Sequence, residues 1–172
     1  MLDQAIATAV KCHSRQWRKH VVHGHRLPYV VHPIEVMKTV WAWGAGAPDI
    51  LAIAVLHDAL EDSSITPKQL ARSFGDEIAR AVQELSFDPE NDGNKDEYIK
   101  RFSEASVPAL VVKLADRYCN MKDHVTTDSA RLKAYRKKSA GLLHIMQQRL
   151  PEISRRFGSG VAKAIAAAFA DL

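Results

Sequence analysis

Cysteine is scarce in this chain, and no part of its 172 residues looks like an export or membrane signal. Cys12 and Cys119 are the only cysteines, so the sequence indicates no disulfide framework and favours a reducing compartment. The first residues lack the uninterrupted apolar core of a signal peptide. No stretch approaches the roughly eighteen consecutive apolar residues that a membrane helix needs. We therefore expect a soluble, cytoplasmic protein that has no membrane partner.

Internal repeats, low-complexity tracts and strand-like alternation are also missing. The length is that of about one domain, and 47% hydrophobic with 26% charged residues is a usual globular mix. The net charge of +4 predicts a mildly basic surface, which suits an anionic ligand such as a nucleotide. Apolar residues recur at three- and four-residue spacing almost throughout. These features predict an all-α fold, a single compact domain over residues 1–172 with about eight to ten helices.

Glycine and proline mark where the helices should begin and end. Pro33 and Pro48 suit first helical turns, Thr66 suits an N-cap, and Gly75 suits the end of a helix. Residues 18–33 contain one glycine and two prolines, and we expect a loop there. The expected helices cover residues 2–17, 33–43, 48–61, 66–74, 76–86, 95–104, 107–125, 128–149 and 159–171.

The segment "ILAIAVLHDALED" places charged groups at the end of a helix that is apolar on all sides. His57, Asp58, Glu61 and Asp62 would form a patch on its last turn. Moving an unpaired carboxylate into an apolar interior costs several kcal/mol or shifts its pKa until it is neutral. Solvent exposure at the helix end, pairing with Arg or Lys, or a bound cation would each relieve that cost.

Further candidate metal ligands lie elsewhere in the chain. Asp116 is the first acid after a second apolar run, and His32 lies in a loop that ends at Pro33. Together with His57 and Asp58 they would make two imidazoles and two carboxylates, a set that suits Mn²⁺, Fe²⁺, Zn²⁺ or Mg²⁺. Spacing alone leaves open both this metal site and a solvated polar helix end.

Five motifs in order resemble a known family. They are "QWRK" at 16–19, "PYVVHP" at 28–33, "LHDALED" at 56–62, "FGDEIARAVQELS" at 74–86 and "VKLADRYCNMKD" at 112–123. The set resembles the HD-domain metal-dependent phosphohydrolases. Within them it is most similar to the hydrolase domain of the RelA/SpoT stringent-response enzymes and to the small alarmone hydrolases, such as the metazoan SpoT homologue. The motif-bearing core would cover residues 1–125, followed by C-terminal helices over residues 128–172.

The resemblance implies roles for particular residues. A metal, usually Mn²⁺, would be held by His32, His57, Asp58 and Asp116. The pair Glu61 and Asp62 would orient or deprotonate the attacking water. The expected substrate-binding residues are Arg18 and Lys19, near the purine and phosphates, and Tyr118 and Asn120, in the segment that lines the nucleoside pocket.

The implied activity is hydrolysis of the 3′-pyrophosphate of guanosine tetra- or pentaphosphate (ppGpp or pppGpp), which gives GDP or GTP and pyrophosphate. We expect no synthetase activity, because no segment of the chain would encode that domain. Residues 20–27 are longer than the family's usual short turn. Another nucleotide, such as the 2′-phosphate of NADPH or a nucleoside phosphate, therefore remains the alternative substrate.

Other functions and residues receive weaker support. A nucleotide sensor would not need the water-activating pair, and the basic residues 131–138 fit a solvated helix face, so we expect no nucleic-acid partner. His13, His20, His23, His25, His124 and His144 match no motif, and we interpret them as surface or packing residues. The sequence does not fix the oligomeric state.

Overall fold

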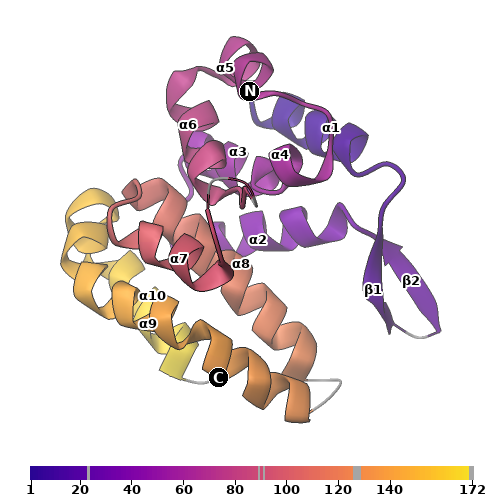
Figure 1. Cartoon of the computed structure of the whole chain (residues 1–172). Helices are drawn as coiled ribbons and strands as arrows, with labels where there is room; N and C mark the ends of the chain where they lie inside the picture. The colour runs from indigo at the N-terminus through magenta and orange to yellow at the C-terminus, as the bar shows by residue number, and fades with distance from the viewer. Residues whose placement is uncertain (23, 89, 91, 126–128, 171–172) are drawn as a thin grey trace.

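The computed structural model describes residues 1–22, 24–88, 90, 92–125 and 129–170, and these form helices with one small β-hairpin (Figure 1). In the first half the helices are α1 (Leu2–Cys12), α2 (Val31–Ala42), α3 (Pro48–Leu56), α4 (Ala59–Asp62), α5 (Pro67–Phe74) and α6 (Asp76–Leu85). The second half contains α7 (Lys95–Lys100), the short 3₁₀ helix η1 (Arg101–Ser103), α8 (Val107–Val125), α9 (Ser129–Phe157) and α10 (Ser159–Ala170). The all-α prediction is confirmed.

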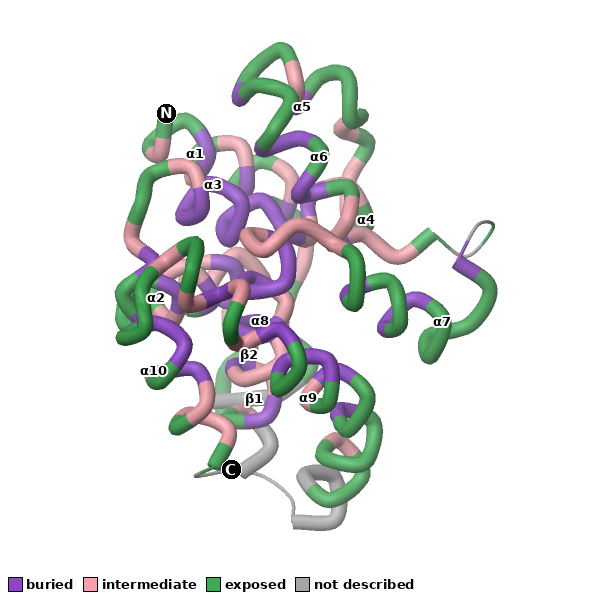
Figure 2. Tube along the Cα trace, turned by 90° about the vertical axis from the view of Figure 1, so that its left-hand side faces the viewer, coloured by how far each residue is buried: buried purple, intermediate pink, exposed green. Residues whose placement is uncertain are grey.

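Two apolar helices, α3 and α8, lie at the centre of the molecule. Helix α3 contacts α1, α2, α6 and α8, and α8 also contacts α2, α6 and α9. Every residue of α3 from Ile50 to Leu56 is buried, and the tube in Figure 2 shows this helix enclosed by its neighbours. A helix that is apolar on all sides is stable only inside a core, which is why α3 takes this place.

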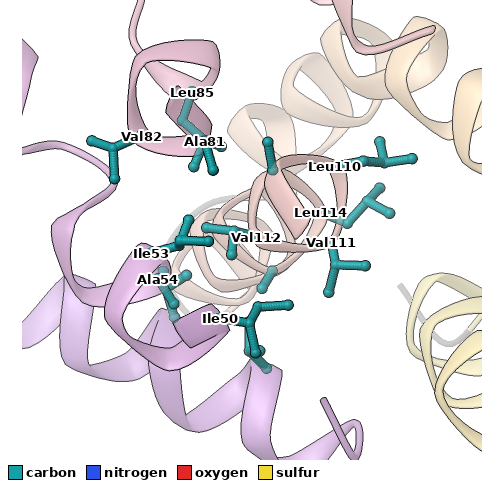
Figure 3. Close-up of a cluster of buried hydrophobic side chains, with 14 of the residues drawn as sticks. Ile50, Ile53, Ala54, Ala81, Val82, Leu85, Leu110, Val111, Val112 and Leu114 are labelled. Atoms are coloured by element: carbon teal, nitrogen blue, oxygen red, sulfur yellow. The ribbon is translucent and has the colours of Figure 1, made fainter. Parts of the chain in front are cut away.

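Side chains from three helices interlock where α3, α6 and α8 meet. Figure 3 shows the cluster, to which the labelled residues Ile50, Ile53, Ala54, Ala81, Val82, Leu85, Leu110, Val111, Val112 and Leu114 belong. Leu110, Val112 and Leu114 have no exposed surface. This packing holds the apolar first part of α8 against α3.

The expected loop over residues 18–33 is mostly wrong, because two strands occupy its first part and α2 begins at Val31, which places His32 on a helix rather than in a loop. Strands β1 (Trp17–Val22) and β2 (His25–Pro28) pair as an antiparallel hairpin, with Val22 opposite His25 and an irregular register toward Trp17. Gly24 at the turn has a φ of +81°, which glycine adopts without the steric cost that a side chain brings. The hairpin projects from the helical body in Figure 1. The strands are too short to show the alternation by which strands are recognised in a sequence.

Two helix ends also differ from the prediction. Helix α1 ends at Cys12 rather than at residue 17, because the chain turns at His13 to enter β1. Helix α9 continues through Pro151 to Phe157, although an interior proline usually costs about 3 kcal/mol. Beyond it Ile153 is fully buried, and this packing outweighs the lost hydrogen bond. The Thr66 cap is confirmed, since Thr66 and Gln69 form a reciprocal capping box.

Gly75 separates α5 from α6 with a φ of +90°, as the helix-end prediction requires. Among the described residues, no helix has the length and apolar character to span a membrane.

The central role of α8 gives a stability prediction. Leu110→Ala should lower the free energy of unfolding by about 2–5 kcal/mol, because it leaves a cavity where three helices meet. Urea denaturation followed by circular dichroism would measure it. Lys137→Ala, at an exposed position on α9, should change that free energy by less than about 0.5 kcal/mol. Equal effects of the two substitutions would contradict this packing.

Candidate metal and catalytic site

Two histidines and two carboxylates meet beside the C-terminal end of α3. His32 comes from the first turn of α2, His57 and Asp58 lie between α3 and α4, and Asp116 comes from α8. His32, His57 and Asp116 are buried, and Asp58 is half-buried. The structure therefore brings together all four residues that the sequence predicted as metal ligands, from three parts of the chain.

The ring nitrogens of the two histidines face the two carboxylates. His32 Nε2 lies 3.1 Å from Asp116 Oδ1 and 3.9 Å from Asp58 Oδ2. His57 Nε2 lies 3.1 Å from Asp58 Oδ2 and 3.9 Å from Asp116 Oδ1. The ligand atoms of His32, His57 and Asp58 lie within 4.8 Å of one another, a spacing that can hold a metal ion.

The hydrogen bonding of His57 suits a metal ligand. Its Nδ1 donates to the carbonyl oxygen of Ala54 at 2.8 Å, which fixes both the ring and its tautomer. Its Nε2 is buried and, within the described part of the chain, has no aligned hydrogen-bond partner. Burying such a nitrogen costs free energy unless a ligand uses it. The donor set of two imidazoles and two carboxylates also fits a divalent ion of the Mn²⁺, Fe²⁺ or Zn²⁺ type.

A break in the helix lets His57 and Asp58 reach the same point. The predicted continuous helix over residues 48–61 is wrong, because α3 ends at Leu56 and α4 begins at Ala59. Asp58 has φ of −97° and ψ of 0°, in the sparsely populated bridge region. In an unbroken helix adjacent side chains do not face each other. The turn at Asp58 removes that restriction.

Neighbouring side chains hold both carboxylates. Asp116 Oδ2 lies 3.2 Å from Lys113 Nζ, and Asp116 Oδ1 accepts a 2.5 Å hydrogen bond from Asn120 Nδ2. Asp58 Oδ2 accepts a 2.7 Å hydrogen bond from the hydroxyl of Tyr29. Asp58 Oδ2 and Asp116 Oδ1, the oxygens that face the histidines, are therefore each held by a donor from the surrounding structure, and Lys113 holds the other oxygen of Asp116.

The pKa values in this cluster reflect the close charges. Burial acts against ionisation of Asp58, but His57 outweighs it and lowers the pKa of that carboxyl. Burial likewise opposes ionisation of Asp116, and Lys113 and His32 hold its pKa well below the usual range. Burial lowers the pKa of His57, whereas Asp58 and Asp116 raise it to about 9 overall. Both carboxylates are thus anionic at neutral pH.

Glu61 and Asp62 lie on α4, one turn beyond the cluster. Glu61 Oε1 accepts a 2.7 Å hydrogen bond from the backbone N–H of Phe87, which follows α6. Burial, and then the charge of Asp58, raises the pKa of Asp62. Shielding from solvent also raises the pKa of Glu61, although the Phe87 N–H opposes the shift. The structure places this pair beside the cluster, as the sequence predicted.

The two predicted basic residues lie on β1. Arg18 is buried at 8% exposure and forms an ion pair with Asp123 of α8. Its guanidinium lies 5.8 Å from the centre of the Tyr29 ring, and Tyr29 in turn binds Asp58. Lys19 is exposed on the same strand. Only Tyr29 lies between Arg18 and the cluster, whereas the structure does not bring Lys19 to the cluster.

Asn120 and Tyr118 point to different parts of the molecule. Asn120 donates to Asp116 and so belongs to the cluster. Tyr118 packs against Trp43 and Phe169, with ring centres 5.7 and 5.9 Å away, and lines a separate cavity of about 550 Å³. The structure therefore does not bring Tyr118 to the four-residue cluster.

A second cavity, of about 360 Å³, adjoins the cluster at Glu61 and Lys113. Its lining is formed by Glu61, Phe87, Lys95, Asp96, Tyr98, Ile99, Lys113, Arg117, Tyr135 and Lys138. Four of these side chains are cationic and two are anionic, so the cavity suits a negatively charged group. We refer to it below as the cationic cavity.

Several residues of this site were not predicted from the sequence. Lys113 forms an ion pair with Asp116, lines the cationic cavity and lies 5.1 Å from the centre of the Tyr98 ring. Its signal was visible as the lone charge inside an apolar run. Tyr29 and Tyr135 gave no comparable signal, because their roles depend on contacts with distant parts of the chain.

The raised pKa of His57 predicts that metal binding releases a proton. With a pKa of about 9, the ring is protonated at pH 7, and it must lose that proton before Nε2 can bind a cation. Titration calorimetry with Mn²⁺, in buffers of different ionisation enthalpy, should therefore show release of about one proton from His57 at pH 7, and less at pH 10. His144→Ala, at an exposed site, should leave this value unchanged. Absence of proton release at pH 7 would contradict the prediction.

Comparison with known proteins agrees with the geometry. A family model described as the HD domain matches residues 5–142. The guanosine-3′,5′-bis(diphosphate) 3′-pyrophosphohydrolase MESH1 of Mus musculus is 33% identical over 127 residues, which cover 71% of this chain and 68% of the mouse protein. The MESH1 protein of Homo sapiens is 32% identical over the same length and coverage.

A solved structure described as a metazoan ortholog of SpoT that hydrolyzes ppGpp has the same fold. It matches with a TM-score of 0.77 and 22% identity, over 99% of this chain and 94% of that one. The HD-domain match covers most of the chain, and the mouse MESH1 relative is 33% identical to it over 127 residues. This chain is an HD-domain phosphohydrolase, and it is related to the MESH1 and SpoT-type 3′-pyrophosphohydrolases.

Proposed function

We propose that this protein hydrolyses the 3′-pyrophosphate of guanosine tetra- or pentaphosphate, giving GDP or GTP and pyrophosphate. The observation that carries the proposal is the junction of the His32, His57, Asp58 and Asp116 cluster with the cationic cavity. The MESH1 relatives, whose names state this activity, support the choice of substrate. The site is proposed to work on the nucleotide without any synthetase step.

The four-residue cluster would hold one divalent ion, and Mn²⁺ is the ion we propose. The His57 Nε2 that lacks an aligned partner, and the mixed nitrogen and oxygen donors, both fit this role. Such an ion supplies positive charge that stabilises the negative charge developing on phosphate oxygens. The protein's part is to keep these ligands in place: Ala54 holds His57, Tyr29 holds Asp58, and Lys113 and Asn120 hold Asp116.

Glu61 and Asp62 are proposed to handle the attacking water. The water oxygen forms a bond to the phosphorus that is attached to the 3′ oxygen. The bond between that phosphorus and the 3′ oxygen breaks, and a proton passes to the 3′ oxygen. One carboxylate of the pair takes the proton from the water. Their raised pKa values make each a stronger base than an ordinary carboxylate, which helps this transfer near neutral pH.

The cationic cavity is proposed to receive the pyrophosphate group. Lys113 connects it to the cluster through Asp116, so the reacting phosphorus and the leaving pyrophosphate would contact neighbouring parts of one site. Arg117 lines the cavity, and its buried Nε has no hydrogen-bond partner among the described residues. That N–H is available to a phosphate oxygen.

One observation favours the alternative, hydrolysis of another nucleotide. Arg18 was predicted to lie near the purine, but Asp123 holds its guanidinium in an ion pair on the hairpin side of the site. Contacts to the base would then differ from those of relatives with a short turn. The NADPH 2′-phosphate and nucleoside phosphates therefore belong in the substrate test.

A product assay with Mn²⁺ over a panel of phosphorylated nucleotides tests the proposal. Guanosine 3′,5′-bis(diphosphate) should release pyrophosphate, and Asp58→Ala should reduce that rate at least about 100-fold, because the site loses a ligand and its charge. His25→Ala, on the exposed part of the hairpin, is the control and should remain active. Faster release of phosphate from NADPH, with no pyrophosphate from the guanosine nucleotide, would establish the alternative.

The role of Lys113 predicts a second activity effect. Lys113→Met keeps the length of the side chain but removes its charge from both Asp116 and the cationic cavity. We expect kcat/KM for the guanosine nucleotide to fall about 10- to 100-fold. Steady-state kinetics at saturating Mn²⁺ would measure it, with Lys100→Met on the exposed side of α7 as the matched control. A loss equal to that of the control would rule out this role.

A further inference from the structure

His13 is a buried polar residue that neither the predicted metal set nor the cationic cavity includes. It caps the C-terminal end of α1, where its backbone N–H donates to the carbonyl oxygen of Ala9. Only 1% of it is exposed, so the surface role considered in the sequence analysis is wrong. A packing role alone would not require the imidazole, since an apolar side chain fills such a position without polar groups.

The imidazole forms a hydrogen bond toward Gln16. His13 Nδ1 lies 2.7 Å from Gln16 Oε1, and because an amide oxygen only accepts, Nδ1 must carry the proton. The other end of the same amide donates from Nε2 to the backbone carbonyl oxygen of Asp62, at 2.8 Å. The two residues thus link the end of α1 to the last residue of α4.

The same imidazole lies beside the carboxylate of Asp62. His13 Nδ1 is 3.7 Å from Asp62 Oδ2, whose side chain remains 34% exposed. Asp62 is therefore held from its buried side and open on the other, as a group that contacts water and substrate requires. The ring of His13 also packs against that of Tyr29, the residue that binds Asp58, with ring centres 5.0 Å apart and planes tilted by 44°.

We propose that His13 and Gln16 form a clamp that fixes the backbone and carboxylate of Asp62 in the orientation needed for the attacking water. The inference rests on the proposed function of Asp62 and adds two positioning residues to it. Helix α4 is only four residues long, so its own hydrogen bonds cannot hold Asp62 in place. Gln16 belongs to the "QWRK" motif, whose basic residues were the ones expected to act.

The clamp predicts an effect on turnover rather than on binding. His13→Ala and Gln16→Leu should each lower kcat about 10- to 100-fold while KM and the Mn²⁺ affinity stay close to wild type, because neither residue contacts the metal ligands through a hydrogen bond. His13→Asn should restore most of the activity, since its amide nitrogen can replace Nδ1 as the donor to Gln16. Steady-state kinetics and titration calorimetry would measure these values.

A double-mutant cycle with Asp62→Asn separates positioning from general destabilisation. In the Asp62→Asn background, His13→Ala should cause little further loss of kcat, because the clamp acts through the missing carboxylate. Arg149→Met is the matched control: it removes another buried side chain, one that binds the carbonyl oxygens of Phe102 and Ala105 far from Asp62. Its effect on kcat should be small in both backgrounds.

The outcomes distinguish the two proposals. A wild-type protein that binds Mn²⁺ but releases no pyrophosphate overturns the proposed function, and the cycle is then run on whichever nucleotide of the panel it hydrolyses. Active wild-type protein with independent, multiplying effects of His13→Ala and Asp62→Asn overturns the clamp. A His13→Asn variant as impaired as His13→Ala, or an equal loss of Mn²⁺ affinity in both, also overturns it.

Discussion

The structure depends on holding two carboxylates, Asp58 and Asp116, next to each other at the edge of an apolar core. The negative charges of the two carboxylates repel each other, and burial also opposes the ionisation of both. Burying an isolated ion costs several kcal/mol. Both nevertheless have lowered pKa values, so the surrounding positive charge and donors more than offset these effects. This compensation comes from Lys113 and Asn120 on α8, from His57 after α3, and from Tyr29 between β2 and α2. The positions of α2, α3 and α8 are therefore set by charge as well as by packing.

Sequence and structure agree best where a local pattern decides the outcome. The apolar spacing predicted the helices, and Thr66 and Gly75 predicted boundaries, because caps and glycine act over a few residues. The break at Asp58 was missed because neither glycine nor proline is present there. It follows from a tertiary requirement, the approach of Asp58 and His57 to a common point. The hairpin was missed because its strands pair with each other over very few residues.

The site was predictable to the extent that its motifs are recognisable. Residue type made His32 and Asp116 candidate partners of His57 and Asp58, but only the family resemblance favoured that set over a polar helix end, since they lie 25 and 58 residues away from the pair along the chain. Tyr29 and His13 were missed because their chemistry arises from burial and partners, which a sequence does not display, whereas Lys113 was visible as a lone charge in an apolar run but had no partner that the sequence could name. Tyr118 shows the reverse case. It lies in a recognised motif, yet its side chain packs with Trp43 and Phe169 on another face of α8.

The four-residue cluster and the Glu61 and Asp62 pair are held in place by different parts of the structure. The four proposed metal ligands lie on α2, on α8 and directly after α3, and the apolar core holds these helices in place. Glu61 and Asp62 lie on one helical turn that could not persist alone, and it is attached at one side by the Phe87 N–H and at the other by Gln16. Changes at the end of α1 or after α6 would therefore alter the positions of Glu61 and Asp62 while the four-residue cluster stays intact. Under the proposed function, the charge that stabilises the phosphate and the base that activates the water would be tuned by separate parts of the chain.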